Sequence, residues 1–174
     1  PMLHPAALPI DDLLDHCDVQ RTRGSGPGGQ HRNKVETAIR LTHRPSGVSV
    51  LASERRSQAQ NKAAAVFRLR VKLAVAVRYR VGGEGKSGAA SVPSALWSSR
   101  VKGGRLSINP KHEDFPALLA EAMDVLEADG YDTSATAQTL AVSTSQLVKL
   151  LRHEPAALQH VNTQRVERGL GALR

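Results

Sequence analysis

Residues 24–30 carry the most distinctive chemistry in this chain, because a glycine-rich run ends there in a single amide side chain, Gln30. Glycine loses much backbone entropy in regular structure and Pro27 donates no hydrogen bond, so the run Gly-Ser-Gly-Pro-Gly-Gly-Gln predicts a loop. Gly28 and Gly29 remove side chains that would clash, and they permit φ values closed to other residues. Cations stand on both sides of this tip, at Arg21, Arg23, Arg32 and Lys34. The pattern favours a loop that carries one polar residue into a deep cleft lined by a polyanion.

This loop has three other interpretations. The spacing Gly24-x-Gly26-x-x-Gly29 matches a dinucleotide-binding fingerprint, but that motif needs a helix after the loop, and here a strand pattern follows. His31 is a candidate general base, because imidazole titrates near neutral pH, yet no carboxylate lies nearby in the sequence to orient it. A surface loop without any role stays open on the loop alone.

The surrounding pattern predicts a small α+β domain over residues 1–80. Residues 11–17 suggest a short helical or irregular lead-in, and residues 18–23 alternate as a strand does. A two-residue alternation places Val35, Thr37, Ile39 and Leu41 on one side of a strand. A turn at 44–47 leads into a return strand, which indicates a hairpin. Ser57-Gln58-Ala59-Gln60 forms a capping-box pattern. The helix it opens should run to about Arg80, with an apolar stripe at Val66, Leu69, Leu73 and Val77.

The rest of the chain predicts a flexible linker over 81–99, rich in Gly, Ser and Ala, and an all-α module over 100–174. One amphipathic helix should begin after an N-cap at Asp114 and stop at Gly130. Helices at about 134–140 and from Ser143 onward resemble a helix-turn-helix, and a last helix covers about 155–168. Such helix pairs are also common in plain bundles.

Charge is concentrated in one segment of the chain, whose net charge is +8. Residues 21–111 carry 19 basic and 3 acidic groups, whereas residues 1–20 carry four acids without Lys or Arg, and residues 112–174 carry 5 basic and 9 acidic groups. A polarised field of this kind predicts a nucleic-acid partner. Aromatic residues make up only 3%, which counts against a single-stranded nucleic-acid binder that works by base stacking. The acidic C-terminal segment disfavours a DNA-reading helix pair.

Composition also limits the class of protein and the cellular compartment that we expect. Hydrophobic residues make up 40% of the chain, enough for a packed core. Cys17 is the single cysteine, and no apolar run reaches the length of a membrane helix. The start of the chain lacks the cations of a secretory or transit peptide. We therefore expect a soluble cytoplasmic protein, and we expect neither a metal site nor a cofactor.

Several motifs between residues 17 and 75 together resemble the GGQ domain of the bacterial-type class I peptide-chain release factors and their stand-alone relatives in stalled-ribosome rescue. The resemblance rests on motifs in the right order and spacing: Ser25 to Gln30, Asn33-Lys34, the strand Thr37 to His43 with the turn Pro45-Ser46-Gly47, and Arg56-Ser57-Gln58 with Asn61.

The resemblance implies hydrolysis of the ester between a nascent peptide and P-site tRNA, in the peptidyl transferase centre of the large ribosomal subunit. It makes Gln30 the catalytic residue, with Gly28 and Gly29 setting its backbone: the backbone N–H stabilises developing negative charge, and the side chain positions water. It also implies methylation of Gln30 by a dedicated glutamine methyltransferase. The candidates for contact with rRNA and tRNA are Arg21, Arg23, Arg32, Asn33, Lys34, Arg55, Arg56 and Lys62. For each cation, the alternative to RNA contact is a solvated surface charge without a binding role. For Ser57, the alternative role is to cap its helix.

The chain also departs from this family. A full release factor has a separate domain that reads the stop codon, and its recognition motifs are not found here, so codon-independent action is expected. The best-known stand-alone relatives end in a basic tail, whereas residues 112–174 are acidic, which leaves the partner of the helical module open. A non-catalytic ribosome- or RNA-binding protein and a helix-turn-helix DNA-binding regulator remain the alternative functions.

Overall fold

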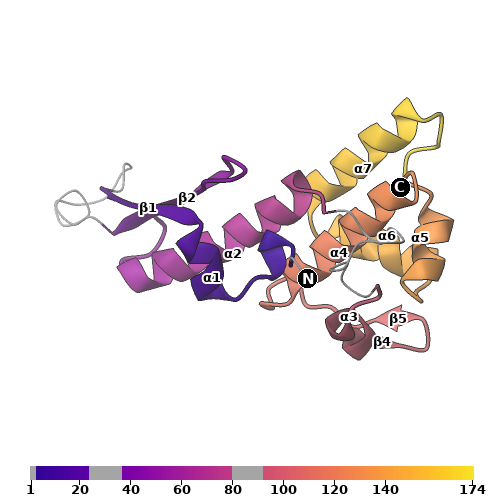
Figure 1. Ribbon diagram of the computed structural model, residues 1–174, viewed down its shortest axis with the longest axis horizontal. Coiled ribbons are helices and arrows are strands. Elements are labelled where there is room, and N and C mark those ends of the chain that lie inside the picture. Colours follow the sequence, from indigo (N-terminus) through magenta and orange to yellow (C-terminus); the bar gives the residue numbers. More distant parts are fainter. Residues whose placement is uncertain (1–2, 24–36, 80–91) are drawn as a thin grey trace.

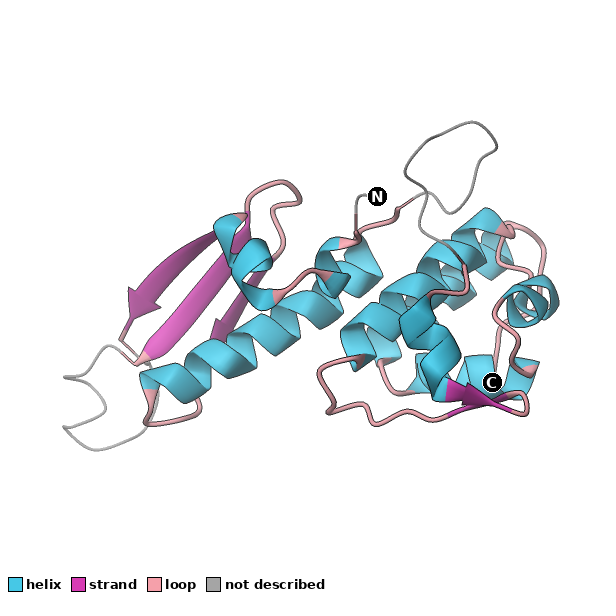
Figure 2. Cartoon of the chain, turned by 60° about the horizontal axis from the view of Figure 1, so that its bottom comes forward, coloured by secondary structure: helices cyan, strands magenta, loops and turns pink. Residues whose placement is uncertain are grey.

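The computed structural model describes residues 3–23, 37–79 and 92–174 (Figure 1). The molecule is elongated, with a small sheet at one end and a group of helices at the other, joined by one long helix (Figures 1 and 2). The elements in chain order are η1 (Pro5–Ala7), α1 (Ile10–Asp15), β1 (Cys17–Thr22), β2 (Ala38–His43), β3 (Ser49–Ala52), α2 (Gln58–Ala76), α3 (Ala95–Arg100), β4 (Val101–Lys102), β5 (Arg105–Leu106), α4 (Phe115–Ala128), α5 (Thr133–Thr139), α6 (Thr144–Arg152) and α7 (Pro155–Glu167). The expected α+β fold class with a helical C-terminal part is confirmed.

Strands β1, β2 and β3 form an antiparallel sheet in that order, and α2 packs against it. Leu41 lies opposite Val19 on one side and Val50 on the other, and its side chain is fully buried. The alternate positions, Arg40 and Leu51, lie opposite each other and are exposed. The two-residue alternation of the sequence therefore gives a sheet with a helix on its inner face and an open outer face.

Helix α2 begins as expected, because the Ser57 hydroxyl accepts a hydrogen bond from the Gln60 N–H (3.4 Å). It ends at Ala76 rather than near Arg80. The Tyr79 N–H donates to Asp124 Oδ1 (3.0 Å) instead of continuing the helix. The Arg78 guanidinium donates to the free carbonyls of Ala74 (2.7 Å) and Val75. A partner far away in the sequence thus decides where this helix stops.

Helix α4 is the central helix of the C-terminal part, and it packs against α2. Its side chains Leu119 and Met123 are fully buried, and they belong to the same hydrophobic cluster as Leu69 and Leu73 of α2. This cluster runs from η1 to α7. The two expected parts of the chain therefore share one core.

The expected linker ends before residue 99. Residues 95–99 belong to helix α3, and residues 80–91 lie outside the described part. Trp97 of α3 is fully buried, and its indole N–H donates to the Leu140 carbonyl (2.8 Å). The ring buries enough apolar surface to fix this helix against α5, despite the Gly, Ser and Ala around it.

The C-terminal helices follow the prediction, with one addition. The Asp132 side chain caps α5 and the Ser143 side chain caps α6, so the expected pair of short helices is present. Asp114 precedes α4 as expected, but its carboxylate pairs with Arg100 instead of capping the helix. The short β4–β5 hairpin was not predicted within the all-α module. No helix in residues 3–23, 37–79 and 92–174 is long and apolar enough to cross a membrane.

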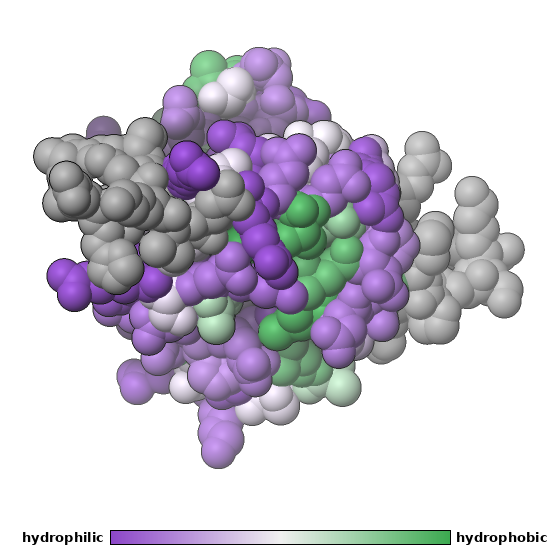
Figure 3. Space-filling model, turned by 90° about the vertical axis from the view of Figure 1, so that its left-hand side faces the viewer, coloured by the Kyte–Doolittle hydropathy of each residue, from purple (hydrophilic) through white to green (hydrophobic). Residues whose placement is uncertain are grey.

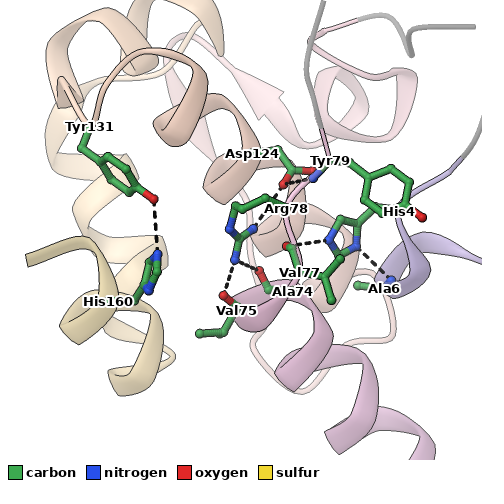
Figure 4. Close-up of polar contacts among 10 residues, drawn as sticks. All are labelled: His4, Ala6, Ala74, Val75, Val77, Arg78, Tyr79, Asp124, Tyr131 and His160. Carbon is green, nitrogen blue, oxygen red and sulfur yellow. Dashed lines mark hydrogen bonds and ion pairs between the residues drawn. The ribbon is translucent and has the colours of Figure 1, made fainter. Parts of the chain in front are cut away.

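A buried polar network joins the end of α2 to α4 (Figure 4). Arg78 lies between the last carbonyls of α2 and the Asp124 carboxylate (3.2 Å), and both side chains are largely buried. His4 accepts a hydrogen bond from the Ala6 N–H at Nδ1 (3.0 Å), so its Nε2–H faces the Val77 carbonyl (3.1 Å). These contacts fix the long helix relative to the C-terminal helices.

Candidate functional site

Six of the predicted site residues, Gly28, Gly29, Gln30, Arg32, Asn33 and Lys34, lie outside the described residues. The described chain reaches Arg23, just after β1, and resumes at Thr37, just before β2. These two residues mark the base from which the glycine-rich segment departs.

Asn61, in the first turn of α2, is the buried centre of this base. Its Nδ2 donates to the carbonyls of Thr37 (2.7 Å) and Arg55 (2.9 Å), and its Oδ1 accepts from the Arg55 N–H (2.9 Å). The residue is fully buried, so these bonds replace the solvent hydrogen bonds that its amide gives up on folding. Asn61 thus holds the return end of the glycine-rich segment to the turn that precedes α2.

The structure brings five predicted cations to the same end of the molecule. Arg21 lies on β1 opposite Ile39, and Arg23 follows that strand. Arg55 and Arg56 lie in the turn that Asn61 holds, and Lys62 follows Asn61 on α2. All five side chains are exposed. This end combines a fixed base with an exposed positive surface, as contact with a polyanion requires.

The acid nearest to this surface in the chain, Glu54, already has a partner. Arg68 of α2 donates to Glu54 Oε2 (3.3 Å) and also pairs with Oε1. Hydrogen bonds from the Glu54 backbone and from the Arg68 side chain lower the pKa of this carboxyl. Glu54 thus stays ionised but is neutralised by Arg68, which leaves the positive charge of Arg55 and Arg56 available. Figure 3 shows that the described surface at this end is mostly hydrophilic, crossed by one band of hydrophobic side chains.

Two residues of this end were absent from the predicted site. Asn61 was part of the quoted motif, but nothing in its type or spacing showed that it would hold both Thr37 and Arg55. Arg40 lies exposed on the outer face of the sheet, between Gln20 and Leu51. Its position in the alternating strand pattern was a signal for an outward-facing cation. Among the described residues, no group of three or more His, Cys, Asp or Glu is placed to hold a metal ion.

Residues 11–94 match the family described as RF-1 domain, over α1, the sheet and α2 up to the start of α3. This segment is an RF-1 domain. The resemblance to the class I release factors is thereby confirmed, and the RF-1 domain extends further than the motifs between residues 17 and 75. Helices α3 to α7 lie after its end.

Curated relatives of the RF-1 domain carry the name peptide chain release factor. The chain is 39% identical over 102 residues to the chloroplastic peptide chain release factor PrfB1 of Arabidopsis thaliana. The matched region covers 59% of this chain and 22% of that protein. It is 45% identical over 73 residues to peptide chain release factor 2 of Mycobacterium sp. (strain KMS). This matched region covers 38% of this chain and 20% of that protein. The chain therefore spans about a fifth of the length of these relatives.

Proposed function

We propose that this chain hydrolyses the ester bond of peptidyl-tRNA in the peptidyl transferase centre of the ribosome, without reading a codon. The observation that carries the proposal is the RF-1 domain at residues 11–94, since it contains the Gly28-Gly29-Gln30 run. The names of the relatives, peptide chain release factors, support the same reaction class.

The proposed chemistry is an attack of water on an activated ester. Such an ester needs little acid–base assistance, so an oriented water and one or two fixed hydrogen-bond donors can supply most of the rate increase. In this proposal the Gln30 backbone N–H stabilises the oxyanion that forms at the ester carbonyl, and the Gln30 side chain orients the water. Gly28 and Gly29 allow the backbone of Gln30 to approach the ester closely.

The base of the RF-1 domain supports this role because it supplies both anchorage and charge. Asn61 fixes the chain at Thr37, seven residues after Gln30, to the turn at Arg55. The proposed contacts with rRNA and tRNA phosphates come from Arg21, Arg23, Arg32, Asn33, Lys34, Arg55, Arg56 and Lys62. Neutralising several phosphates makes binding dependent on salt concentration, so ribosome affinity should fall as salt rises.

Peptide release from programmed ribosomes tests the proposal. We would measure release of labelled peptide from ribosomes stalled on mRNA that ends in the P site, and compare it with ribosomes that hold a stop codon in the A site. Codon-independent action predicts release from the first substrate, with no requirement for a stop codon. Release that depends on a stop codon would contradict this part of the proposal.

Variants of the loop test the chemistry itself. Gln30→Ala and Gly29→Ala should abolish most release while ribosome binding, measured by co-sedimentation, is retained. Gln138→Ala, at an exposed glutamine of α5, makes the same change far from the RF-1 domain and should release peptide as the wild type does. Equal release by all of these proteins would exclude the proposed role of Gln30. Binding without release by the wild type would instead favour a non-catalytic ribosome-binding protein.

Methylation of the Gln30 side-chain amide by a glutamine methyltransferase is also proposed. Mass spectrometry of the loop peptide, purified from the natural host, should show one added methyl group on Gln30. An unmodified peptide from growing cells would count against this partner.

A further inference from the structure

The β4–β5 hairpin lies directly against the start of helix α6. Its tip, Gly103-Gly104, has φ values of 54° and 73°, which suit a tight two-residue turn that other residues rarely adopt. The Ser143 N–H, at the start of α6, donates to the Gly104 carbonyl (3.2 Å). The Leu106 N–H donates to Gln146 Oε1 of α6 (3.4 Å). Two elements that the sequence separates by about forty residues thus form one unit.

This hairpin places two cations opposite each other. Lys102 pairs with Arg105 across the ladder, and both side chains are exposed. Like charges at directly opposed positions destabilise a ladder, and neither side chain has an ion pair with an acid in the described part of the chain. The neighbouring pair, Val101 and Leu106, packs against the hydrophobic core instead. A polyanion bound to the outer side of the hairpin would relieve this repulsion.

Helix α6 adds a third cation beside the hairpin. Lys149 is exposed and lines a small recess together with Leu106 and Ile108, the residues at and after β5. It has no ion pair among the described residues either. We call Lys102, Arg105 and Lys149 the hairpin cations. The β4–β5 hairpin and α6, which carry them, lie at the opposite end of the molecule from the β1–β2–β3 sheet (Figures 1 and 2).

Two acids of residues 112–174 are paired with arginines, and three more are hydrogen-bonded to uncharged groups of the chain. The contacts pair Asp114 with Arg100, Glu121 with Ser94, Asp124 with Arg78 and Tyr79, Asp129 with Thr136, and Asp132 with the first backbone N–H groups of α5. None of these contacts involves one of the hairpin cations. An acidic total coexists there with exposed cations on the hairpin and beside it.

The face is suited to a phosphate backbone rather than to base edges. Readout of DNA bases in the major groove depends on long polar side chains such as Arg, Asn or Gln that are free to pair with them. On α6, Gln146 accepts the Leu106 N–H, and Arg152 donates to the Arg174 carbonyl. Double-stranded RNA is recognised mostly by its shape and by contacts to its phosphates and 2′-hydroxyls, which cations on a small rigid unit can provide.

We infer that the hairpin cations form a second RNA-binding site, which contacts the phosphate backbone of double-stranded RNA. This goes beyond the proposed hydrolysis, because the site lies outside the RF-1 domain and takes no part in the reaction. It also identifies a partner for the helical module, which the sequence left open.

Binding to an isolated RNA duplex tests the inference independently of peptide release. We would measure fluorescence anisotropy of a labelled RNA duplex of roughly 20 base pairs, long enough for one side of a helix to be covered, with the full chain at several salt concentrations. The Lys102→Ala/Arg105→Ala variant should bind at least about tenfold more weakly at low salt. Its slope of log affinity against log salt should be smaller by about 2, because each of the two removed cations would neutralise one phosphate. Lys149→Ala should reduce the slope by about 1.

Controls separate the site from net charge and from misfolding. Lys72→Ala/Lys111→Ala removes two charges from exposed side chains outside the hairpin and α6, and it should retain most of the affinity. Lys102→Arg/Arg105→Lys keeps both charges and should bind as the wild type does. Unchanged binding by the hairpin variant, or an equal loss in the control variant, would overturn the site. Tighter binding to a DNA duplex of the same sequence would overturn the assignment to RNA.

Discussion

At the scale of single residues, Asn61 shows how one buried amide prepares a site without taking part in its chemistry. Its three hydrogen bonds connect the return end of the glycine-rich segment, the turn before α2 and the first turn of that helix. The sequence predicts Gln30 and the flanking cations as site residues, because their types and spacing are recognisable. It could not identify this connection, because the partners of a buried amide depend on the folded chain.

Removing this amide should weaken both stability and release. Asn61→Ala leaves the Thr37 carbonyl and the Arg55 backbone groups without their buried partner, so the free energy of unfolding should fall by about 3 kcal/mol. Urea denaturation followed by circular dichroism measures this loss. Asn109→Ala, at an exposed asparagine that accepts one backbone hydrogen bond, is the control and should cost under about 1 kcal/mol. Equal losses in the two variants would contradict the role assigned to Asn61.

Asp124 should give the protein a measurable pH dependence. Burial raises the pKa of this carboxyl to about 6, from an ordinary value of 3.8, although the Tyr79 N–H and Arg78 favour the ionised form. The folded state then holds the proton more tightly than the unfolded state does. The contribution to stability is complete below the unfolded pKa and is lost as pH rises through about 6. The difference between the two pKa values corresponds to about 3 kcal/mol.

The pH dependence that Asp124 causes must be measured against a variant, because His4 changes the stability in the opposite direction as pH rises. Burial lowers the pKa of His4 to about 4, so its contribution is lost as pH falls. Asp124→Asn removes the carboxyl alone and leaves His4 in place. We expect the stability of the wild type relative to this variant to decrease between about pH 4 and pH 7. A relative stability that increases over this range would show that the Arg78 ion pair outweighs burial.

At the scale of elements, the sequence predicted what depends on local pattern. The capping residue Ser57 and the apolar stripe of α2 are local, so the start and the buried face of this helix were predicted correctly. The end of α2 was predicted incorrectly, because Asp124 of helix α4 accepts a hydrogen bond from the Tyr79 N–H. The β4–β5 hairpin has two residues in each strand, too few to show an alternation. The burial of Trp97 was not predicted, because the Gly, Ser and Ala residues around it indicated a linker.

Packing of α4 against α2 should make the two helices mutually dependent. Leu119→Ala creates a cavity in the cluster that contains Leu69 and Leu73, so the free energy of unfolding should fall by about 3 kcal/mol. Native-state hydrogen exchange should report faster opening in α2 as well as in α4. Val166→Ala, at an exposed position of α7, should change stability by less than about 0.5 kcal/mol. Faster exchange confined to α4 would show that the two helices open separately.

At the scale of the whole molecule, the shared core and the charge distribution were the least predictable features. The glycine- and serine-rich stretch after α2 suggested two independent parts, whereas the hydrophobic cluster runs through both. The acidic total of residues 112–174 disfavoured a DNA-reading helix pair, but it did not show that five of these nine acids are held in contacts within the chain. Composition could show neither feature, because it counts residues and does not record which of them face each other.

A single core predicts a single unfolding transition. Trp97 is the only tryptophan, and it lies outside the RF-1 domain, so its fluorescence reports on the helical end. Far-ultraviolet circular dichroism reports on all the helices, including α2. In urea the two signals should change at the same midpoint. A tryptophan transition at a lower urea concentration would show that the helical end unfolds first.

The described chain stops at Tyr79 and resumes at Val92, and helix α4 binds a residue on each side of this gap. Asp124 accepts the Tyr79 N–H (3.0 Å), and Glu121, one turn earlier, accepts the Ser94 N–H (2.6 Å) and pairs with its hydroxyl (2.5 Å). Both anchor points are therefore set by α4 and not by the covalent connection between them. We expect two separately expressed fragments, divided within residues 80–91, to recognise each other and reconstitute the protein. The chain is in this respect a natural candidate for a split reporter, in which assembly of the halves restores activity.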